Sequence, residues 1–335
     1  MAGVYFLILI GVVQITAVFL VAFGLGGDGI ILSAVRAILI HTVLILTALL
    51  MQKFPKKSKD KNHSNNLGNT YKNVQSKGLE SLIKNFDLDK KITIQSAALM
   101  AIVAMISIVS FILLHNAVID LFMRGGFYNS GEIVIGNFGM FVLLVFAMAV
   151  MPAISEELLF RGLIMKSLLP YGRIFAVVLS SFMFSLFHLN PAQTVYQFIL
   201  GLLFAGVYLR TRNMWYPIIL HFFNNFIIIL HTYITQTLGT GSDVAFSWTV
   251  TMTVSTVVLA VLGGLILWKI VQGLRPSPEK QSLTSDEKEN KKEKIVSKEK
   301  LGFKEIAWLF AGIGIAMFIW VFVWVTSGGS EDEEE

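Results

Sequence analysis

The chain has 335 residues, of which 55% are hydrophobic and 15% charged, and its formal net charge is +5. Soluble domains usually contain about 25% charged residues, so this composition excludes an ordinary soluble globular protein. The basic residues are concentrated in loops beside apolar runs. This pattern is typical of the positive-inside rule for membrane topology, so it explains the positive charge better than nucleic-acid binding does. Because the sequence has no cysteine, disulfides, thiol nucleophiles and cysteine metal ligands are excluded.

Long apolar runs predict an all-α polytopic membrane protein, because one crossing of the bilayer core needs about 20 apolar residues. The first 27 residues are uncharged. They lack the basic start and the cleavage site of a signal peptide, so we interpret them as a retained helix. We predict nine membrane helices, with eight as the alternative. The predicted spans are 4–25, 30–51, 93–114, 133–152, 174–189, 192–209, 214–234, 247–268 and 306–325.

The run from Ile174 to Leu209 contains 36 uncharged residues. One helix of that length would extend about 54 Å, too far for a single crossing of a core about 30 Å thick. Asn190 and Pro191 form a natural break within it. The run therefore predicts a hairpin of two short helices.

The loops predict the orientation of the chain. Residues 53–91 carry ten lysines against four acidic residues, and residues 270–304 carry nine basic residues. Both segments should face the cytoplasm, which places the N terminus inside and the acidic tail Ser330–Glu335 outside. We expect a multi-pass protein of a bacterial cell membrane.

An acidic pair, Glu156 and Glu157, follows an uncharged run from Ile133 to Ser155. Ser155 could cap a helix from Glu156 to Leu169, and the pair would then be ordinary first-turn residues at the cytoplasmic end of the fourth membrane helix. Charge beside a membrane span more often indicates function. Glu157 and Arg161 are four apart and can pair on one helix face, which leaves Glu156 free for another task.

Two histidines lie inside later apolar runs. His188 precedes the Asn190-Pro191 break, whereas His221 and Asn225 are four apart on one helix face. Alone, each would be an interfacial residue or interhelical hydrogen-bonding group. Together with the acidic pair they supply three helices with groups suited to hydrolysis.

These motifs, Glu156-Glu157-x-x-x-Arg161, Phe184-x-x-x-His188 and His221-x-x-x-Asn225, resemble those of the CPBP family of intramembrane proteases. The family includes the type II CAAX prenyl endopeptidases and the Abi or bacteriocin self-immunity proteins. The resemblance covers about residues 133–235. It implies that Glu156 and His188 activate a water for attack on a peptide carbonyl. It further implies that His221 and Asn225 hydrogen-bond the oxyanion, with Glu157 and Arg161 in support.

We expect no cofactor, since no His-Glu-x-x-His helix is present; a zinc held by Glu156, His188 and His221 is the alternative. The expected partners are the lipid bilayer and a peptide or membrane-tethered protein substrate, with no nucleic acid. A second hypothesis is a non-catalytic scaffold that binds a membrane or cell-envelope protein through the extra helices or linkers. A transporter is a third, but no inverted repeat is visible.

The sequence thus predicts seven parts in chain order. These are two N-terminal membrane helices (1–52), a lysine-rich cytoplasmic linker (53–91), a third membrane helix with an external loop (92–132), a CPBP/Abi protease core (133–235), a further membrane helix (236–271), a charged cytoplasmic linker (272–304), and a C-terminal membrane helix with an acidic tail (305–335).

Overall fold

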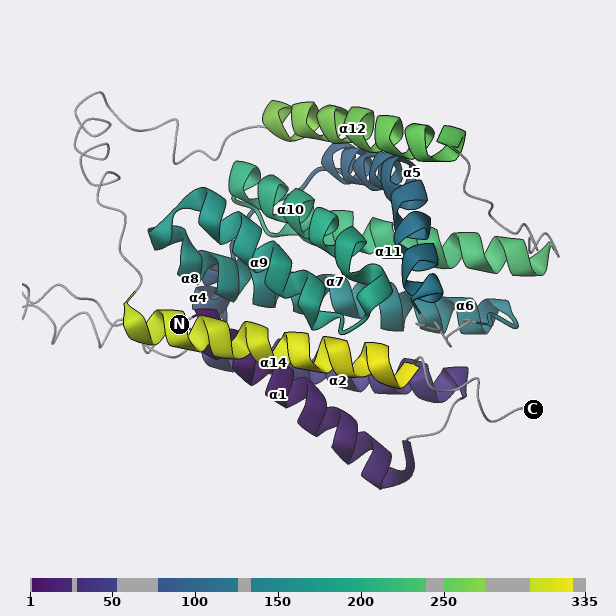
Figure 1. Ribbon diagram of the computed structural model, residues 1–335. Helices are drawn as coiled ribbons and strands as arrows, with labels where there is room; N and C mark the ends of the chain where they lie inside the picture. The colour runs from purple at the N-terminus through teal and green to yellow at the C-terminus, as the bar shows by residue number, and fades with distance from the viewer. Residues whose placement is uncertain are drawn as a thin grey trace, which may run out of the picture.

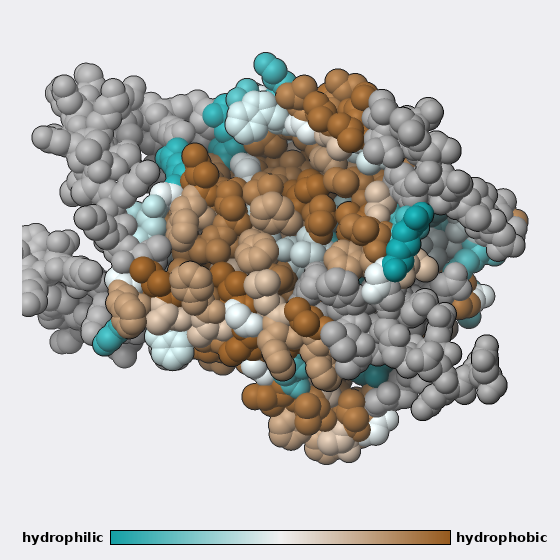
Figure 2. All heavy atoms as spheres, viewed as in Figure 1, coloured by the Kyte–Doolittle hydropathy of each residue, from teal (hydrophilic) through white to brown (hydrophobic). Residues whose placement is uncertain are grey.

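The computed structural model describes residues 2–25, 29–52, 78–125, 134–238, 250–274 and 302–327. Every regular element among these residues is a helix. Seven of the helices are long and apolar enough to cross a membrane by length and composition, and hydrophobic residues cover much of the face in Figure 2. The predicted all-α polytopic membrane protein is confirmed, whereas the count of nine crossings stays a prediction.

The N-terminal half contains α1 (Ala2–Leu20), η1 (Val21–Leu25), α2 (Ile30–Met51), α4 (Gly78–Asn85), α5 (Ile94–Arg124), α6 (Phe138–Val145), η2 (Phe146–Val150), α7 (Met151–Glu157), η3 (Leu158–Met165), α8 (Lys166–Leu168) and η4 (Leu169–Tyr171). The remaining elements are α9 (Arg173–Phe187), η5 (Pro191–Gln193), α10 (Thr194–Thr211), α11 (Trp215–Thr237), α12 (Val250–Gly273) and α14 (Phe303–Ser327).

The helices α7, α9, α10 and α11 form the centre of the bundle (Figure 1). On one side α5 packs against α11, and α12 packs on the other face of α5. On the opposite side α1 packs against α2 and α14. The helix α2 also contacts α7 and both flanking stretches η2 and η3, so an N-terminal helix reaches the centre of the bundle.

The predicted hairpin is confirmed, because α9 and α10 pack against each other on either side of a break at residues 188–193. At the break the side chain of Asn190 accepts a hydrogen bond from the backbone N–H of Ala192. The helix α9 begins after Gly172, whose φ of 126° lies in the region that favours glycine. With 15 residues α9 is shorter than the seven candidate spans.

The predicted helix start at Ser155 is wrong. Residues Phe138–Tyr171 form one continuous helical segment of 34 residues, capped at its start by the side chain of Asn137. Pro152 does not end it, because a proline is tolerated in the first turn of α7 and the π-helical stretch η2 changes the hydrogen-bond register just before it. Ser155 and the acidic pair therefore lie within a helix and not at the end of one.

Two other predicted boundaries are also wrong. The third membrane helix continues ten residues beyond 114 to Arg124, where an i,i+4 ion pair with Asp120 keeps polar residues on an exposed helix face. Residues 78–91, assigned to the first linker, are folded as α4 and a segment packed on the bundle. Residues 53–77, most of the second linker and the acidic tail lie outside the described residues.

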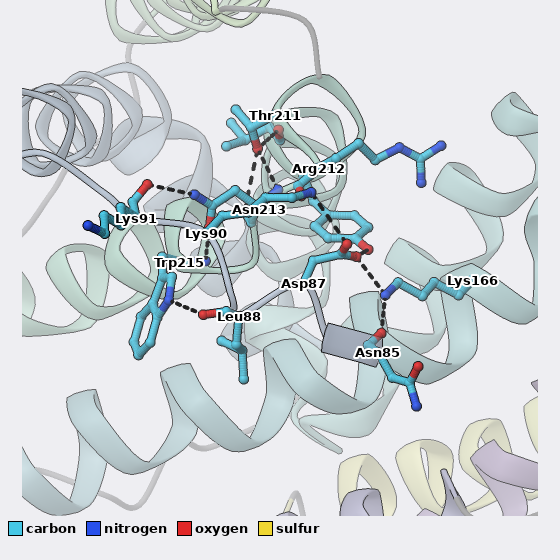
Figure 3. Close-up of polar contacts among 12 residues, drawn as sticks. Asn85, Asp87, Leu88, Lys90, Lys91, Lys166, Thr211, Arg212, Asn213 and Trp215 are labelled. Carbon is cyan, nitrogen blue, oxygen red and sulfur yellow. Dashed lines mark hydrogen bonds and ion pairs between the residues drawn. The ribbon is translucent and has the colours of Figure 1, made fainter. Parts of the chain in front are cut away.

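The segment 86–91 is anchored at the ends of α8, α10 and α11 (Figure 3). The backbone carbonyl of Leu88 accepts a hydrogen bond from Trp215 Nε1 at 3.0 Å, and that of Lys91 accepts one from Asn213 Nδ2 at 3.2 Å. The ring of Phe86 is buried against Gly162, where an added Cβ would come within 2.6 Å of it. This segment therefore packs directly on the helix that carries the acidic pair.

Asp87 is the polar centre of the same segment (Figure 3). Its carboxylate accepts a hydrogen bond from Tyr208 Oη at 2.6 Å and pairs with Lys166 Nζ at 2.7 Å and Lys90 Nζ at 3.5 Å. Burial alone would raise the pKa of Asp87, but the hydrogen bonds from Lys166 and Tyr208 and the two lysine charges outweigh it and hold the pKa below its usual value. The ionised carboxylate thus ties α8 to α10.

Candidate active site

The acidic pair lies deep inside the protein. Glu156 is 5% exposed, Glu157 0% and Arg161 1%. Glu156 is 15 residues before the end of its helical segment at Tyr171, a distance of about 22 Å along the axis. Charged groups so fully removed from solvent are costly unless they are paired. The surroundings of each glutamate therefore show what it can do.

Glu157 is paired through one oxygen, Oε1, whereas its Oε2 is buried without a hydrogen-bond partner among the described residues. Its Oε1 accepts a hydrogen bond from Arg161 at 2.8 Å and lies 2.9 Å from His221 Nδ1. The other guanidinium branch of Arg161 donates to the backbone carbonyl of Gly201 at 3.0 Å. An added Cβ at Gly201 would come within 2.9 Å of Ser181 on α9, so only glycine permits this close approach of the two helices. Glu157 thus joins its own helix to α11, and Arg161 joins it to α10.

Aromatic rings enclose this ion pair. The guanidinium carbon of Arg161 lies 4.6 Å from the ring centroid of Phe184 and 5.2 Å from that of Phe204. Phe204 also stacks on His221, with centroids 5.0 Å apart. Cation–π contacts of this kind are strongest where water is excluded. The phenylalanine of the second motif therefore has a physical role, which is to cover the buried arginine.

Glu156 has a different environment. Its Oε2 is buried and has no hydrogen-bond partner among the described residues. His188 Nε2 lies 3.9 Å from that oxygen, which exceeds a hydrogen bond. The other ring nitrogen of His188, Nδ1, is 2.9 Å from the carbonyl of Phe184 and so donates to it. In the neutral ring Nε2 is then an acceptor beside Glu156.

Asn225 lies one turn beyond His221 on α11. Its Nδ2 donates to the backbone carbonyl of Met148 at 3.0 Å. The residue four positions after Met148 is Pro152, which has no N–H to give to that carbonyl. Asn224 donates to Asn225 Oδ1 at 3.3 Å and accepts from Tyr196 Oη at 3.0 Å. The amide of Asn225 is therefore held on both sides, with one Nδ2 hydrogen left over.

A further histidine reaches the site from α2. His41 Nδ1 lies 2.7 Å from the hydroxyl of Ser155, the residue before Glu156. His41 is also within electrostatic range of Glu156, His188 and His221. The sequence marks His41 as a histidine in an apolar run that could be functional, but the pattern alone assigns it no role.

The structure thus brings five of the six predicted site residues together in two groups, whereas Asn225 contacts Met148 and Asn224 instead. Glu156 lies beside His188, and Glu157 contacts both Arg161 and His221. Sequence reasoning missed the residues that hold these groups in place, since nothing in their spacing distinguishes them from ordinary packing. They are Gly201, Tyr196, Phe204 and Asn224.

A zinc ion held by Glu156, His188 and His221 stays an untested alternative. No group of three or more His, Asp or Glu residues that could hold a metal is found in the part of the chain that the structure describes. His221 Nδ1 contacts Glu157, so a metal would have to bind Nε2 of that ring. We assign no step to a metal.

Comparison with known proteins supports the same family as the motifs. Residues 138–227 match the family model described as Type II CAAX prenyl endopeptidase Rce1-like. "Putative membrane peptidase YdiL" of Bacillus subtilis (strain 168) is 30% identical over 90 residues, which are 26% of this chain and 37% of that relative's length. No solved structure matches.

The fold and the site define an integral-membrane protein with a polar centre enclosed by apolar helices. The two matches support a CPBP family protein, as the three motifs predicted. The matched segment contains all three motifs, whereas α1, α2, α5, α12 and α14 lie outside it.

Proposed function

We propose that the protein is an integral-membrane endopeptidase of the CAAX protease and Abi type, which hydrolyses a peptide bond with an activated water. The observation that carries this proposal is the environment of Glu156, a buried carboxylate with a free oxygen 3.9 Å from His188 Nε2. A water in contact with both groups loses a proton to the carboxylate as it attacks the substrate carbonyl. General-base assistance of this kind contributes about 10²–10⁴ in rate.

His221 and Asn225 are the proposed oxyanion donors. Asn225 uses one Nδ2 hydrogen on the Met148 carbonyl, which leaves the second for a substrate oxygen. His221 directs Nδ1 to Glu157, so its Nε2 is the nitrogen left for the substrate, and donation there requires a ring that carries both protons. A preorganised donor in a site that excludes water is worth about 2.7–4 kcal/mol of transition-state stabilisation.

Glu157 and Arg161 are the proposed support of the site. Their pair holds His221 and the α10 carbonyl in fixed positions, and they need not touch the substrate. The proton that Glu156 takes from water passes to the leaving nitrogen as the C–N bond breaks. Charge is then balanced, and Glu156 returns to its starting form. No cofactor enters this scheme; zinc analysis of the purified protein and activity after chelation test that expectation.

The test uses the full chain in phospholipid vesicles with a mixed-sequence peptide library, in which mass spectrometry detects new peptide ends. We expect Glu156→Ala and His188→Ala to abolish cleavage without changing the unfolding temperature. Glu80→Ala, which alters an exposed glutamate in α4, should cleave as the wild type does. Wild-type cleavage by Glu156→Ala would contradict the assignment.

The scaffold hypothesis makes a different prediction. If the physiological role is to bind a partner, Glu156→Ala should fully rescue the phenotype of a gene deletion. The endopeptidase proposal requires that it does not. The orientation also remains part of the proposal: N terminus in the cytoplasm and a bacterial cell membrane, with a peptide or membrane-tethered substrate.

A further inference from the structure

His41 occupies an unusual place in the protein. It lies in the middle of α2, eleven residues after Ile30 and ten before Met51, in a helix whose one formally charged residue is Arg36. This helix is outside the matched segment 138–227 but packs against α7, η2 and η3. A polar ring at mid-helix in a membrane span is costly and normally has a specific partner.

Its partner is Ser155. The Nδ1–Oγ distance is 2.7 Å, whereas the other hydrogen-bond contact of the hydroxyl, to the carbonyl of Pro152, is long at 3.4 Å. Ser155 is 0% exposed. A short hydrogen bond in such an enclosed place is expensive to lose, because it leaves a buried polar group unsatisfied. The contact therefore ties α2 firmly to the residue before Glu156.

The helical turn that carries Glu156 needs a contact of this kind to fix its position. The helix α7 has seven residues and lies between two π-helical stretches, η2 and η3. Regular α-helical hydrogen bonds therefore extend over a short stretch only, and they do not by themselves fix the direction of the Glu156 side chain. Its carboxyl oxygen has no hydrogen-bond partner among the described residues that would set it instead.

The other groups around His41 belong to the same site. Glu156 on α7, His188 at the end of α9 and His221 on α11 all act electrostatically on the ring. Polar groups from four elements thus lie within electrostatic range of one another around His41. His41 is the one of these contributed from outside the matched segment.

We propose that His41 is a positioning residue of the site, which through Ser155 fixes the α7 turn and so directs the Glu156 carboxylate toward His188. This inference rests on the proposed hydrolytic function. An error of about 1 Å in the placement of a reacting group can cost about 100-fold in rate. Loss of the hydrogen bond between His41 and Ser155 should therefore lower kcat and leave KM unchanged.

The experiment is a double-mutant cycle on the full chain in phospholipid vesicles, with the most rapidly cleaved peptide of a mixed-sequence library as the substrate. The variants are His41→Ala, Ser155→Ala and the double variant. We expect each single variant to lower kcat by about 10- to 100-fold, with no further loss in the double variant. Such non-additivity indicates that the two side chains act as one unit.

Two further variants separate positioning from folding. In His41→Asn the side-chain amide occupies the place of Nδ1 and keeps the bond to Ser155, so kcat should recover to within about threefold of the wild type. His231→Ala, at an exposed histidine on α11, should leave kcat unchanged. Unfolding temperatures of all variants check that the fold is retained.

Additive losses in the double variant, or His41→Asn as slow as His41→Ala, would overturn the inference. So would unchanged kcat in His41→Ala alongside an inactive Glu156→Ala, and in that case the proposed function itself would stand. If Glu156→Ala instead cleaves as the wild type does, the proposed function fails first.

Discussion

Glu156 and Glu157 are neighbours in the chain but have different environments. Oε1 of Glu157 accepts from Arg161 and contacts His221, whereas Glu156 lies 3.9 Å from His188 Nε2. Each glutamate also has a buried Oε2 without a hydrogen-bond partner among the described residues. Successive residues on a helix point about 100° apart, so the two side chains meet different neighbours. This difference allows one carboxylate to hold the site while the other serves as the proposed base.

Removing one partner of the buried Glu157–Arg161 pair should strongly destabilise the protein. Arg161→Met keeps most of the side-chain volume but leaves the Glu157 charge buried without its cation. We expect a loss of about 3–5 kcal/mol in the free energy of unfolding. Denaturant titration of the protein in detergent micelles measures it.

Arg124→Met is the matched control. Arg124 also pairs at i,i+4 spacing, with Asp120 at 2.9 Å, but the two side chains are 69% and 36% exposed. An exposed pair contributes about 0–1 kcal/mol. Equal losses in the two variants would show that the burial of Arg161 has no energetic consequence.

The sequence predicts a contact between two side chains correctly where their spacing along one helix determines it. The four-residue interval predicts that Glu157 and Arg161 pair, and they do. It cannot predict that His221 joins the same carboxylate, since that contact depends on how α11 packs. Whether these residues catalyse hydrolysis is a prediction that the geometry alone does not test.

At the scale of elements, the continuous helix around the acidic pair is the main difference from the sequence prediction. Pro152 and Ser155 are typical of a helix start. Here the π-helical stretch η2 lets the helix continue through Pro152, and Asn137 caps the start of the segment. Local signals of this kind are ambiguous, because packing in the bundle decides whether a helix continues. The hairpin of α9 and α10 was predictable because length alone excludes a single crossing.

The segment 86–91 gives the protein a pH-dependent contribution to stability. The pKa of Asp87 is lowered in the folded state, so its carboxylate stabilises the fold fully above the unfolded pKa of about 3.9 and less as the pH falls toward the folded pKa. Asp87→Asn should therefore be less stable than the wild type at pH 5–7, with a difference that shrinks below about pH 4. Unfolding curves over this pH range measure the difference.

Asp89→Asn, which alters an exposed residue two positions further along, serves as the control and should change stability by less than about 0.5 kcal/mol. A difference between Asp87→Asn and the wild type that stays constant down to pH 2 would contradict this account. The segment 86–91 was hidden from sequence analysis because its lysines and aspartates resemble those of the neighbouring linker.

For the whole molecule, composition was sufficient to predict a helical membrane protein, since apolar runs of this length are typical of membrane-spanning helices. Composition does not say which helices enclose the site. The matched segment supplies the three motifs, yet α2 from the N-terminal part also contacts the helix that carries them. The extra helices are therefore part of the structure around the site, whatever further partner they bind.

The proposed hydrolysis of a peptide bond requires Glu156. Mass spectrometry of peptides from cells that carry the wild type or Glu156→Gln tests it most directly, because the substrate need not be known beforehand. We expect a precursor that accumulates uncut in the variant and a product that only the wild type yields. Identical peptides in the two strains, at equal levels of the membrane protein, would contradict it.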